Sequence, residues 1–312
     1  MASSSKIIID LRSDTLTIPD RGMRQAMYDA EVGDDCFGED KVVKELEGYC
    51  ADLFCKEAAL LMPSGTMSNQ VGASSLVSKG NEIITDACYH INFFESSQTT
   101  TLSGVAISTI QSESGKLTPS NIISAIDSKA HWNSMYCQPD AIWVENSINA
   151  KGGVCYSISE LADIHRFAIS RKIPIYMDGA RLINAAIATG NKLNSYSQFV
   201  DAISICLSKG LGAPLGSVLM GEASFIDQAR KYRKWFGGAL HQSGIFAAAG
   251  LYALKNNIKG VGEDNQKAAE FYNLISDNSR LSVVQPETNI VIFDVIDAVS
   301  YTHLTLPTIY SV

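Results

Sequence analysis

The sequence predicts an α/β protein whose central sheet is mostly parallel, followed by a small α+β unit at the C-terminal end. The first observation is that short apolar runs alternate with helical patterns between Ala58 and Cys206, as in strands joined by crossover helices. The second is that several of these runs end abruptly in polar residues and glycine. The third is that no internal repeat, low-complexity block or heptad run interrupts this order.

The strands are predicted from short apolar runs that are bounded by turn-forming residues. We expect residues 217–220 to pair back beside the strand before them, and two short strands to follow a helix near the end, at 280–284 and 289–294. The remaining strands are expected at 56–62, 82–85, 105–110, 141–144, 173–177 and 201–206.

The helices are predicted from apolar residues three and four positions apart. Pro119 after Thr118 marks one helix start, and the capping-box spacing from Ser157 to Glu160 marks another. The helices are expected at 21–28, 38–50, 69–77, from 118, and at 157–170, 225–235 and 245–256. Before them, Ile7–Arg12 is expected to be an arm or an edge strand, within an N-terminal arm over residues 1–20.

Composition narrows the class of protein. The chain has 312 residues, of which 46% are hydrophobic and 19% charged, so a large core and some surface buried in an oligomer are expected. A net charge of −8 argues against nucleic acid or an anionic membrane as the partner. Seven scattered cysteines without a CxxC pair, no secretory signal and no long apolar run indicate a cytoplasmic protein without a disulfide framework or a zinc site.

Polar groups follow the ends of five predicted strands. In such sheets, ligands bind at the carboxyl ends of the strands, so these groups are expected to face one crevice. They are Ser64-Gly65-Thr66, His90, Glu145-Asn146, Asp178-Gly179-Ala180-Arg181 and Ser208-Lys209.

Each of these signals also has an ordinary structural interpretation. Lys209 taken alone is better explained as a lysine whose ammonium reaches solvent from a strand end. The Ser64-Gly65-Thr66 turn is either a phosphate cradle at a helix start or an ordinary capped turn. A single histidine such as His90 is more often structural than catalytic.

Together, these groups are the parts that pyridoxal 5'-phosphate requires. Lys209 would form the Schiff base, and Asp178 would keep the pyridine nitrogen protonated. Arg181 could bind a substrate carboxylate through two hydrogen bonds, and His90 over the ring would stack or transfer protons. A dinucleotide-binding GxGxxG motif and a GxSxG nucleophile elbow are absent from the expected places. Asp34-Asp35 and Glu39-Asp40 are interpreted as solvated carboxylates at helix ends, so no metal is expected.

From Asp10 to about Asn257, the chain resembles the pyridoxal-phosphate-dependent L-threonine aldolases, which have the aspartate aminotransferase-like fold, fold type I. The order and spacing of several short motifs carry this resemblance. They are Asp10-Leu11-Arg12-Ser13-Asp14-Thr15, Val32-Gly33-Asp34-Asp35, Gly38-Glu39-Asp40, Pro63-Ser64-Gly65-Thr66, Glu145-Asn146-Ser147, Met177-Asp178-Gly179-Ala180-Arg181 and Ser208-Lys209-Gly210-Leu211-Gly212-Ala213-Pro214.

The resemblance implies retro-aldol cleavage of L-threonine or L-allo-threonine to glycine and acetaldehyde. It also implies a homotetramer with shared active sites. The implied catalytic residues are Lys209, His90 and Asp178, and Ser13 and Arg181 would hold the substrate carboxylate. The implied cofactor-binding residues are Ser64, Gly65, Thr66, His90, Asp178, Lys209, Lys234 and His241.

The chain departs from the family pattern in three places. Relatives carry a histidine close after Glu145-Asn146 that addresses the substrate hydroxyl, and this run has none. The family's arginine that reaches a neighbour's phosphate is His241 here, with Lys234 as the residue that would compensate. From about residue 298 the sequence does not resemble the family, so we expect a large cofactor-binding domain over 1–255 and a truncated small domain over 256–312 with a non-native tail.

Four alternatives remain open at this point. The same lysine, aspartate and phosphate cradle would serve aldol cleavage of another β-hydroxy amino acid. They would equally serve β-elimination or racemisation. A non-catalytic structural relative is a further alternative, against which the presence of both Lys209 and Asp178 argues.

Overall fold

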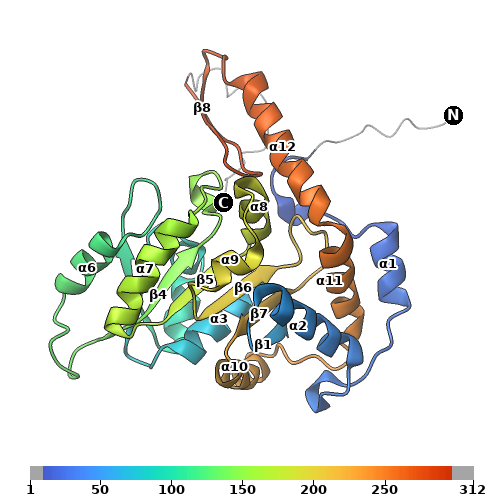
Figure 1. The fold of residues 1–312 in the computed structure, drawn as a ribbon, viewed down its shortest axis with the longest axis horizontal. Helices are drawn as coiled ribbons and strands as arrows, with labels where there is room; N and C mark the ends of the chain where they lie inside the picture. Colours follow the sequence, from blue (N-terminus) through green and yellow to red (C-terminus); the bar gives the residue numbers. More distant parts are fainter. Residues whose placement is uncertain (1–9, 297–312) are drawn as a thin grey trace.

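The computed structural model describes residues 10–296, and its centre is a seven-stranded sheet between layers of helices (Figure 1). The strand order is β1-β7-β6-β5-β4-β2-β3. The strands are β1 (Ala58–Met62), β2 (Glu82–Asp86), β3 (Ala106–Ile110), β4 (Pro139–Glu145), β5 (Ile175–Gly179), β6 (Ala202–Cys206) and β7 (Ser217–Gly221).

The directions of the strands place the predicted strand-end residues at one edge of the sheet. β2, β3, β4, β5 and β6 run parallel, whereas β7 is antiparallel to both β6 and β1. β1 therefore runs in the same direction as β6. The carboxyl ends of β1, β2, β4, β5 and β6 all lie at one edge of the sheet, which confirms the prediction of a mostly parallel sheet with a shared edge.

All seven helices that were predicted by residue range are present. These are α1 (Arg21–Tyr28), α2 (Lys41–Phe54), α3 (Gly65–Leu76), α6 (Pro119–Asp127), α7 (Ile158–Arg171), α10 (Ala223–Trp235) and α11 (Gly244–Asn256). α3 begins four residues earlier than expected, because the Ser64 side chain caps it by accepting a hydrogen bond from the Met67 amide. α4 (His90–Phe93) begins at His90, where the sequence indicates the junction of a strand and a helix. The sequence analysis did not predict α5 (Ser96–Gln98), α8 (Leu182–Thr189) or α9 (Leu193–Ser197).

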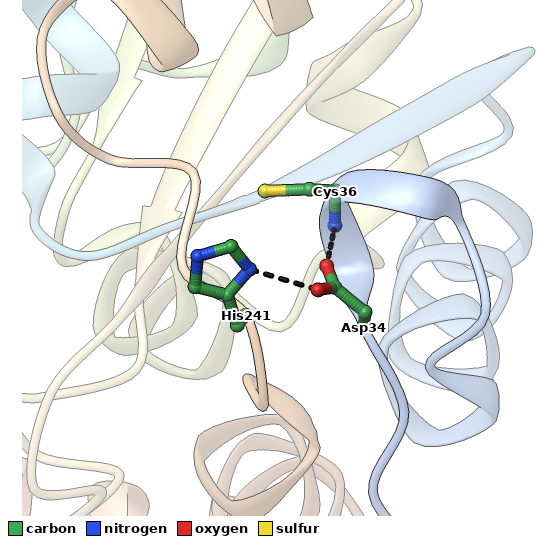
Figure 2. Close-up of side chains that lie close together, drawn as sticks. All are labelled: Asp34, Cys36 and His241. Atoms are coloured by element: carbon green, nitrogen blue, oxygen red, sulfur yellow. Dashed lines mark hydrogen bonds and ion pairs between the residues drawn. The ribbon is translucent and has the colours of Figure 1, made fainter.

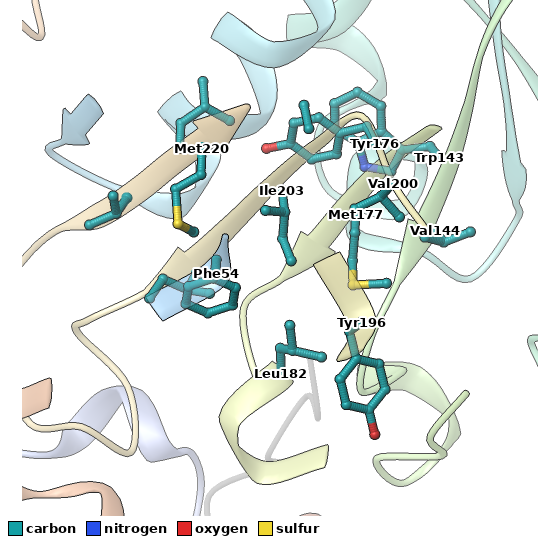
Figure 3. Packing of buried hydrophobic residues seen from close by; sticks show 14 of the residues in the cluster. Phe54, Trp143, Val144, Tyr176, Met177, Leu182, Tyr196, Val200, Ile203 and Met220 are labelled. Carbon is teal, nitrogen blue, oxygen red and sulfur yellow. The ribbon is translucent and has the colours of Figure 1, made fainter. Parts of the chain in front are cut away.

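The core lies on both faces of the sheet, and Figure 3 shows part of it. Trp143 on β4 stacks on Tyr176 of β5, with their ring centroids 3.7 Å apart. Tyr176 faces α3, where a Cβ at Gly72 would lie only 2.5 Å from its ring. A side chain at residue 72 would therefore push α3 away from the sheet. On the opposite face, Phe54 and Leu182 are buried from α2 and α8.

The C-terminal part is α12 (Ile258–Ile275) followed by a separate antiparallel pair, β8 (Leu281–Val284) and β9 (Ile292–Val295), which extend away from the main sheet (Figure 1). Both predicted short strands are present. The division of the chain at residue 255 remains a prediction, and the tail from about residue 298 lies outside the described residues. At the other end, residues 10–13 form no strand, and the rest of the predicted arm before Asp10 is also outside the description.

Two carboxylates that the sequence suggested were solvated are in fact buried. Asp35 forms an ion pair of 2.7 Å with the buried Arg233, and Asp40 is 1% exposed. Asp40 caps α2 through the amides of Val42 and Val43, and its other oxygen accepts from the Gly244 amide. The interpretation was wrong for Asp35 and Asp40 because their partners lie about 200 residues further along the chain.

Candidate active site

Lys209 lies just beyond the carboxyl end of β6, on a loop whose backbone is fixed from two sides. Its carbonyl accepts hydrogen bonds from the Gly212 amide at 2.8 Å and from the Thr17 hydroxyl at 2.7 Å. The side chain is half-buried, and within residues 10–296 its Nζ makes no hydrogen bond. Among the described residues, the amine is thus held at the sheet edge without a hydrogen-bond partner.

Asp178 ends β5 as a buried carboxylate with two fixed donors. Oδ2 accepts from the amide side chain of Asn69 at 2.8 Å, and Oδ1 accepts from the Ala180 backbone at 3.0 Å. Asn69 belongs to α3, and its Oδ1 accepts from the Tyr176 hydroxyl at 3.2 Å. The helix that begins at the predicted phosphate turn therefore also orients the carboxylate.

His90 begins α4, and its ring is oriented by a buried carboxylate. Nδ1 lies 2.5 Å from Oε1 of Glu95, a residue that is 1% exposed, so Nδ1 carries a proton and Nε2 is the remaining nitrogen. Glu95 also accepts from Asn69 at 2.9 Å and from Gln70 at 2.7 Å. Burial by itself lowers the pKa of His90, but the hydrogen bond that its ring donates to Glu95 and the nearby carboxylates, Asp178 among them, raise it above the ordinary value.

Glu145 at the end of β4 holds two neighbouring loops. Its oxygens accept from the backbone amides of His90 at 2.6 Å and Asn149 at 2.8 Å. Burial and the charge of Asp178 raise the pKa of Glu145 to about 7, despite these two amide hydrogen bonds. The carboxyl group therefore changes charge near neutral pH, between the histidine and the arginine of the site.

Arg181 lies beyond β5 and is paired with a carboxylate of this chain. Nε and Nη2 each donate to Asp14 at 2.7 Å, and Nη1 donates to the Asn149 side chain at 2.9 Å. Asp14 also accepts from Asn289 at 3.1 Å. Three of the five guanidinium N–H groups are used in these bonds. Within the part of the chain that the structure describes, one N–H on each terminal nitrogen is unpaired and could serve a substrate.

Ser13 lies next to Asp14 and uses its oxygen locally. Its Oγ accepts from the Thr15 amide at 3.2 Å and from the Thr15 hydroxyl at 2.9 Å. Ser13 itself therefore still has its hydroxyl hydrogen to donate.

The start of α3 presents free backbone N–H groups. The Ser64 cap accepts from Met67 at 3.1 Å, which leaves the amides of Gly65 and Thr66 without an intrahelical partner. A Cβ built on Gly65 would lie 2.7 Å from Sγ of Cys206, the last residue of β6. Only glycine lets this helix start lie against the strand that leads to Lys209.

Lys234 lies on α10, and His241 lies between α10 and α11. Within residues 10–296, no hydrogen bond or ion pair joins them to Lys209, Asp178 or His90. Instead, His241 Nδ1 donates to Asp34 at 2.8 Å (Figure 2). Lys234 Nζ lies 3.6 Å from Sγ of Cys36.

The sequence analysis missed Asn69 and Glu95, which connect Asp178 to His90. Asn69 lies on α3 and Glu95 lies in the turn between α4 and α5, so neither directly follows a strand and the strand-end rule did not select them. Among the helices of the described part of the chain, none combines the length and the apolar character that crossing a membrane requires.

Comparisons with known proteins identify the family. The family model for beta-eliminating lyases matches residues 10–298. The chain is 39% identical to the low specificity L-threonine aldolase of Escherichia coli O157:H7, covering 84% of this chain and 77% of that protein. It is 37% identical to low-specificity L-threonine aldolase 1 of Arabidopsis thaliana, covering 93% and 82%.

A solved structure supports the fold. The threonine aldolase of Leishmania major superposes with a TM-score of 0.80 at 18% identity, over 91% of this chain and 83% of that one. Taken with the family match and the two relatives, this agreement leads to one conclusion: the chain belongs to the beta-eliminating lyase family, alongside its low-specificity L-threonine aldolases.

Proposed function

We propose that this protein is a pyridoxal 5'-phosphate-dependent aldehyde-lyase that cleaves L-threonine and L-allo-threonine to glycine and acetaldehyde. The family supports the lyase class, and the names of the relatives support the substrate. The observation that carries the proposal is that Lys209, Asp178, His90 and the start of α3 lie at one edge of the sheet.

The residues at this edge fit the cofactor. Lys209 offers an amine without a hydrogen-bond partner in the described residues, and Asp178 is a buried carboxylate suited to a protonated ring nitrogen. Gly65 and Thr66 offer free N–H groups at the positive end of α3, which suits a phosphate. When bound, the cofactor supplies a carbonyl carbon for the amine and a ring that accepts electrons from the broken bond.

Arg181 and Ser13 would hold the carboxylate of the amino-acid substrate. Asp14 fixes one side of the guanidinium, so its two remaining N–H groups are presented in a defined direction. A carboxylate bound by two such hydrogen bonds is oriented as well as attracted. The orientation matters because only one bond at the α-carbon can be aligned for cleavage at a time.

His90 would accept the proton of the β-hydroxyl group at Nε2. The hydrogen bond with Glu95 fixes the proton on Nδ1, so the neutral ring has its lone pair on Nε2. The raised pKa of His90 makes its ring a stronger base than an ordinary histidine, which favours its accepting the hydroxyl proton.

We further propose a cytoplasmic homotetramer with active sites shared between subunits, in which Lys234 and His241 reach the cofactor phosphate of a neighbour. Large apolar side chains beside this pair support a contact surface there: Phe37 is 79% exposed and Trp235 is 64% exposed. All seven cysteines lie within residues 10–296 and are unpaired, which agrees with a reducing compartment.

The Lys209→Ala variant tests the function. Loss of glycine formation from L-threonine, together with loss of borohydride-trapped cofactor, is expected, while the circular dichroism spectrum stays the same. Acetaldehyde, pyruvate and D-alanine are measured in parallel with the unaltered protein. Acetaldehyde as the main product supports the proposal; pyruvate or D-alanine as the main product, or full activity of the variant, would overturn it.

A further inference from the structure

Asn149 begins the short helix η4 (Asn149–Lys151), in the loop that follows β4, and its backbone is fixed at the candidate active site. The Asn149 amide donates to Oε1 of Glu145 at 2.8 Å. Further along the same loop, the Gly153 carbonyl accepts from the Thr288 hydroxyl at 3.2 Å, so the C-terminal part of the chain also holds it. The side chain of Asn149 therefore projects from a backbone that has little freedom to move.

The amide group of Asn149 has only one orientation that fits Arg181. Nη1 of Arg181 is a donor, so the atom 2.9 Å from it must be the amide oxygen, Oδ1. The amide nitrogen, Nδ2, then carries two N–H groups. Within residues 10–296, Nδ2 makes no hydrogen bond, and it keeps contact with solvent although the residue is half-buried. These donors are thus available to a ligand next to the guanidinium.

Covalent geometry allows Nδ2 to bind the same anion as Arg181. Nη1 carries two N–H groups, one of which donates to Asn149 Oδ1. Because these N–H bonds are about 120° apart, an oxygen bound to the second one would lie roughly 5 Å from Oδ1. Within the amide group, Nδ2 is about 2.2 Å from Oδ1, so it can approach that oxygen to roughly 3 Å, a normal hydrogen-bond distance.

We propose that Asn149 is a substrate-binding residue, whose Nδ2 donates a hydrogen bond to the carboxylate of the amino-acid substrate. This inference rests on the proposed function, because it takes the ligand of Arg181 and Ser13 to be that carboxylate. A carboxylate offers about four lone-pair sites, so it can accept from all three residues at once. A donor from a separate segment fixes the plane of the carboxylate as well as its position, which helps to align one bond at the α-carbon for cleavage.

The β-hydroxyl oxygen of the substrate is the alternative acceptor for Nδ2. The carboxylate is favoured because it lies on Arg181, whose Nη1 is bound to the same amide group. It is also favoured because a charged acceptor forms the stronger hydrogen bond. Glycine separates the two acceptors, since it has the carboxylate of the substrate and no hydroxyl group.

The experiment measures glycine binding by calorimetry, with the full-length protein loaded with pyridoxal phosphate. Asn149→Ala should bind glycine about tenfold more weakly or worse, because a hydrogen bond to a charged group is lost. The KM for L-threonine should rise by a similar factor. Asn256→Ala is the matched control: Asn256 is exposed, and within the described part of the chain its side chain donates to the Tyr252 carbonyl alone. This control should bind glycine as tightly as the unaltered protein.

A second comparison separates direct contact from an effect through Arg181. The Arg181→Lys variant keeps the positive charge beside Asp14 but loses the planar guanidinium that Asn149 orients. If Asn149 only orients that guanidinium, adding Asn149→Ala to Arg181→Lys should change glycine binding no further. Direct contact predicts a further loss in this background, by a factor similar to that in the unaltered protein.

Three results would overturn the proposal: unchanged glycine binding in Asn149→Ala, a loss confined to L-threonine, or a loss that vanishes in the Arg181→Lys background. Asn149→Asp keeps the shape of the side chain and the oxygen that faces Arg181, so it serves if the alanine variant folds poorly. It should bind glycine at least as weakly as Asn149→Ala, and tight binding would likewise refute the contact. Thermal melts and cofactor absorbance show whether each variant is folded and loaded.

The outcome is independent of cleavage. A protein that binds glycine through Asn149 but forms no acetaldehyde from L-threonine would refute the proposed reaction and leave the carboxylate contact standing. A protein that forms acetaldehyde but binds glycine equally well with and without the Asn149 side chain would do the reverse.

Discussion

Arg181 and Asp14 form a two-hydrogen-bond ion pair in which Nε and Nη2 each lie 2.7 Å from a carboxylate oxygen. Both side chains are nearly buried, with 11% and 8% of their surfaces exposed. The pair joins the segment before α1 to the end of β5, 167 residues apart. An arginine predicted to bind substrate is thus already oriented by the chain itself.

The first prediction concerns this pair. Asp14→Asn removes the charge that fixes the guanidinium, so we expect the KM for L-threonine to rise by about tenfold, roughly 1.4 kcal/mol, with a smaller change in kcat. The free energy of unfolding should also fall, because a nearly buried arginine loses its counter-charge. Steady-state kinetics and denaturant melts measure the two effects. Asp163→Asn, which breaks an exposed pair with Arg166, is the control; an unchanged KM in Asp14→Asn would contradict the role of Asp14.

The second prediction concerns Asn69, which donates to both Asp178 and Glu95. Asn69→Ala leaves two buried carboxylates without this shared donor, at a cost of about 1–3 kcal/mol. We expect pyridoxal phosphate to bind at least about tenfold more weakly, as measured by equilibrium dialysis. Ser75→Ala on the same helix removes only a bond to the Val71 carbonyl and should leave cofactor affinity intact. Equal affinity in the two variants would show that Asn69 does not position Asp178.

The strand-end residues could be predicted because their position follows from a local pattern. An apolar run shows where a strand ends, and parallel strands place their carboxyl ends at one edge. Lys209, Asp178, His90 and the Ser64-Gly65-Thr66 turn were all found in this way. Whether each performs its predicted role is a question for the experiments above.

The residues that orient them could not be found by the same rule. Asn69 and Asp178 are 109 residues apart, and no periodicity in either segment indicates that they meet. Likewise, Asp35 and Asp40 lie in glycine-containing turns, so from the sequence they resemble solvated carboxylates. Their partners, Arg233 and the Gly244 amide, come from distant segments and are known only from the fold. Helix α8 was missed because its short apolar run has the same composition as a buried strand.

The third prediction follows from the pKa of Glu145, which burial and Asp178 raise from 4.5 to about 7. A carboxyl group with a raised folded pKa contributes stability below its unfolded pKa and loses it as pH rises through the folded value. The native protein should therefore lose roughly 1–2 kcal/mol of unfolding free energy from this group between pH 5.5 and 8. Glu145→Gln cannot titrate, so its curve should lack this contribution.

Denaturant melts of both proteins at pH 5.5 and pH 8 check this. Glu145→Gln should lower the free energy of unfolding more at pH 5.5 than at pH 8. A further loss that does not depend on pH is expected, because the glutamine side chain has one acceptor oxygen for the two backbone amides that Glu145 binds. A difference between the two proteins that does not change with pH would show that Glu145 does not titrate in this range.

The final prediction concerns the approach of α3 to β6. Gly65→Ala would place a Cβ only 2.7 Å from Sγ of Cys206, so α3 must move and its free amides with it. We expect pyridoxal phosphate to bind at least about tenfold more weakly in this variant, since a hydrogen-bond cradle depends on the positions of its donors. Cys206→Ala removes the sulfur and should by itself change cofactor affinity little. The double variant should then recover most of the lost affinity, a coupling that a double-mutant cycle measures directly. Additive losses in the double variant would instead show that Gly65 is required for a reason other than its distance from Cys206.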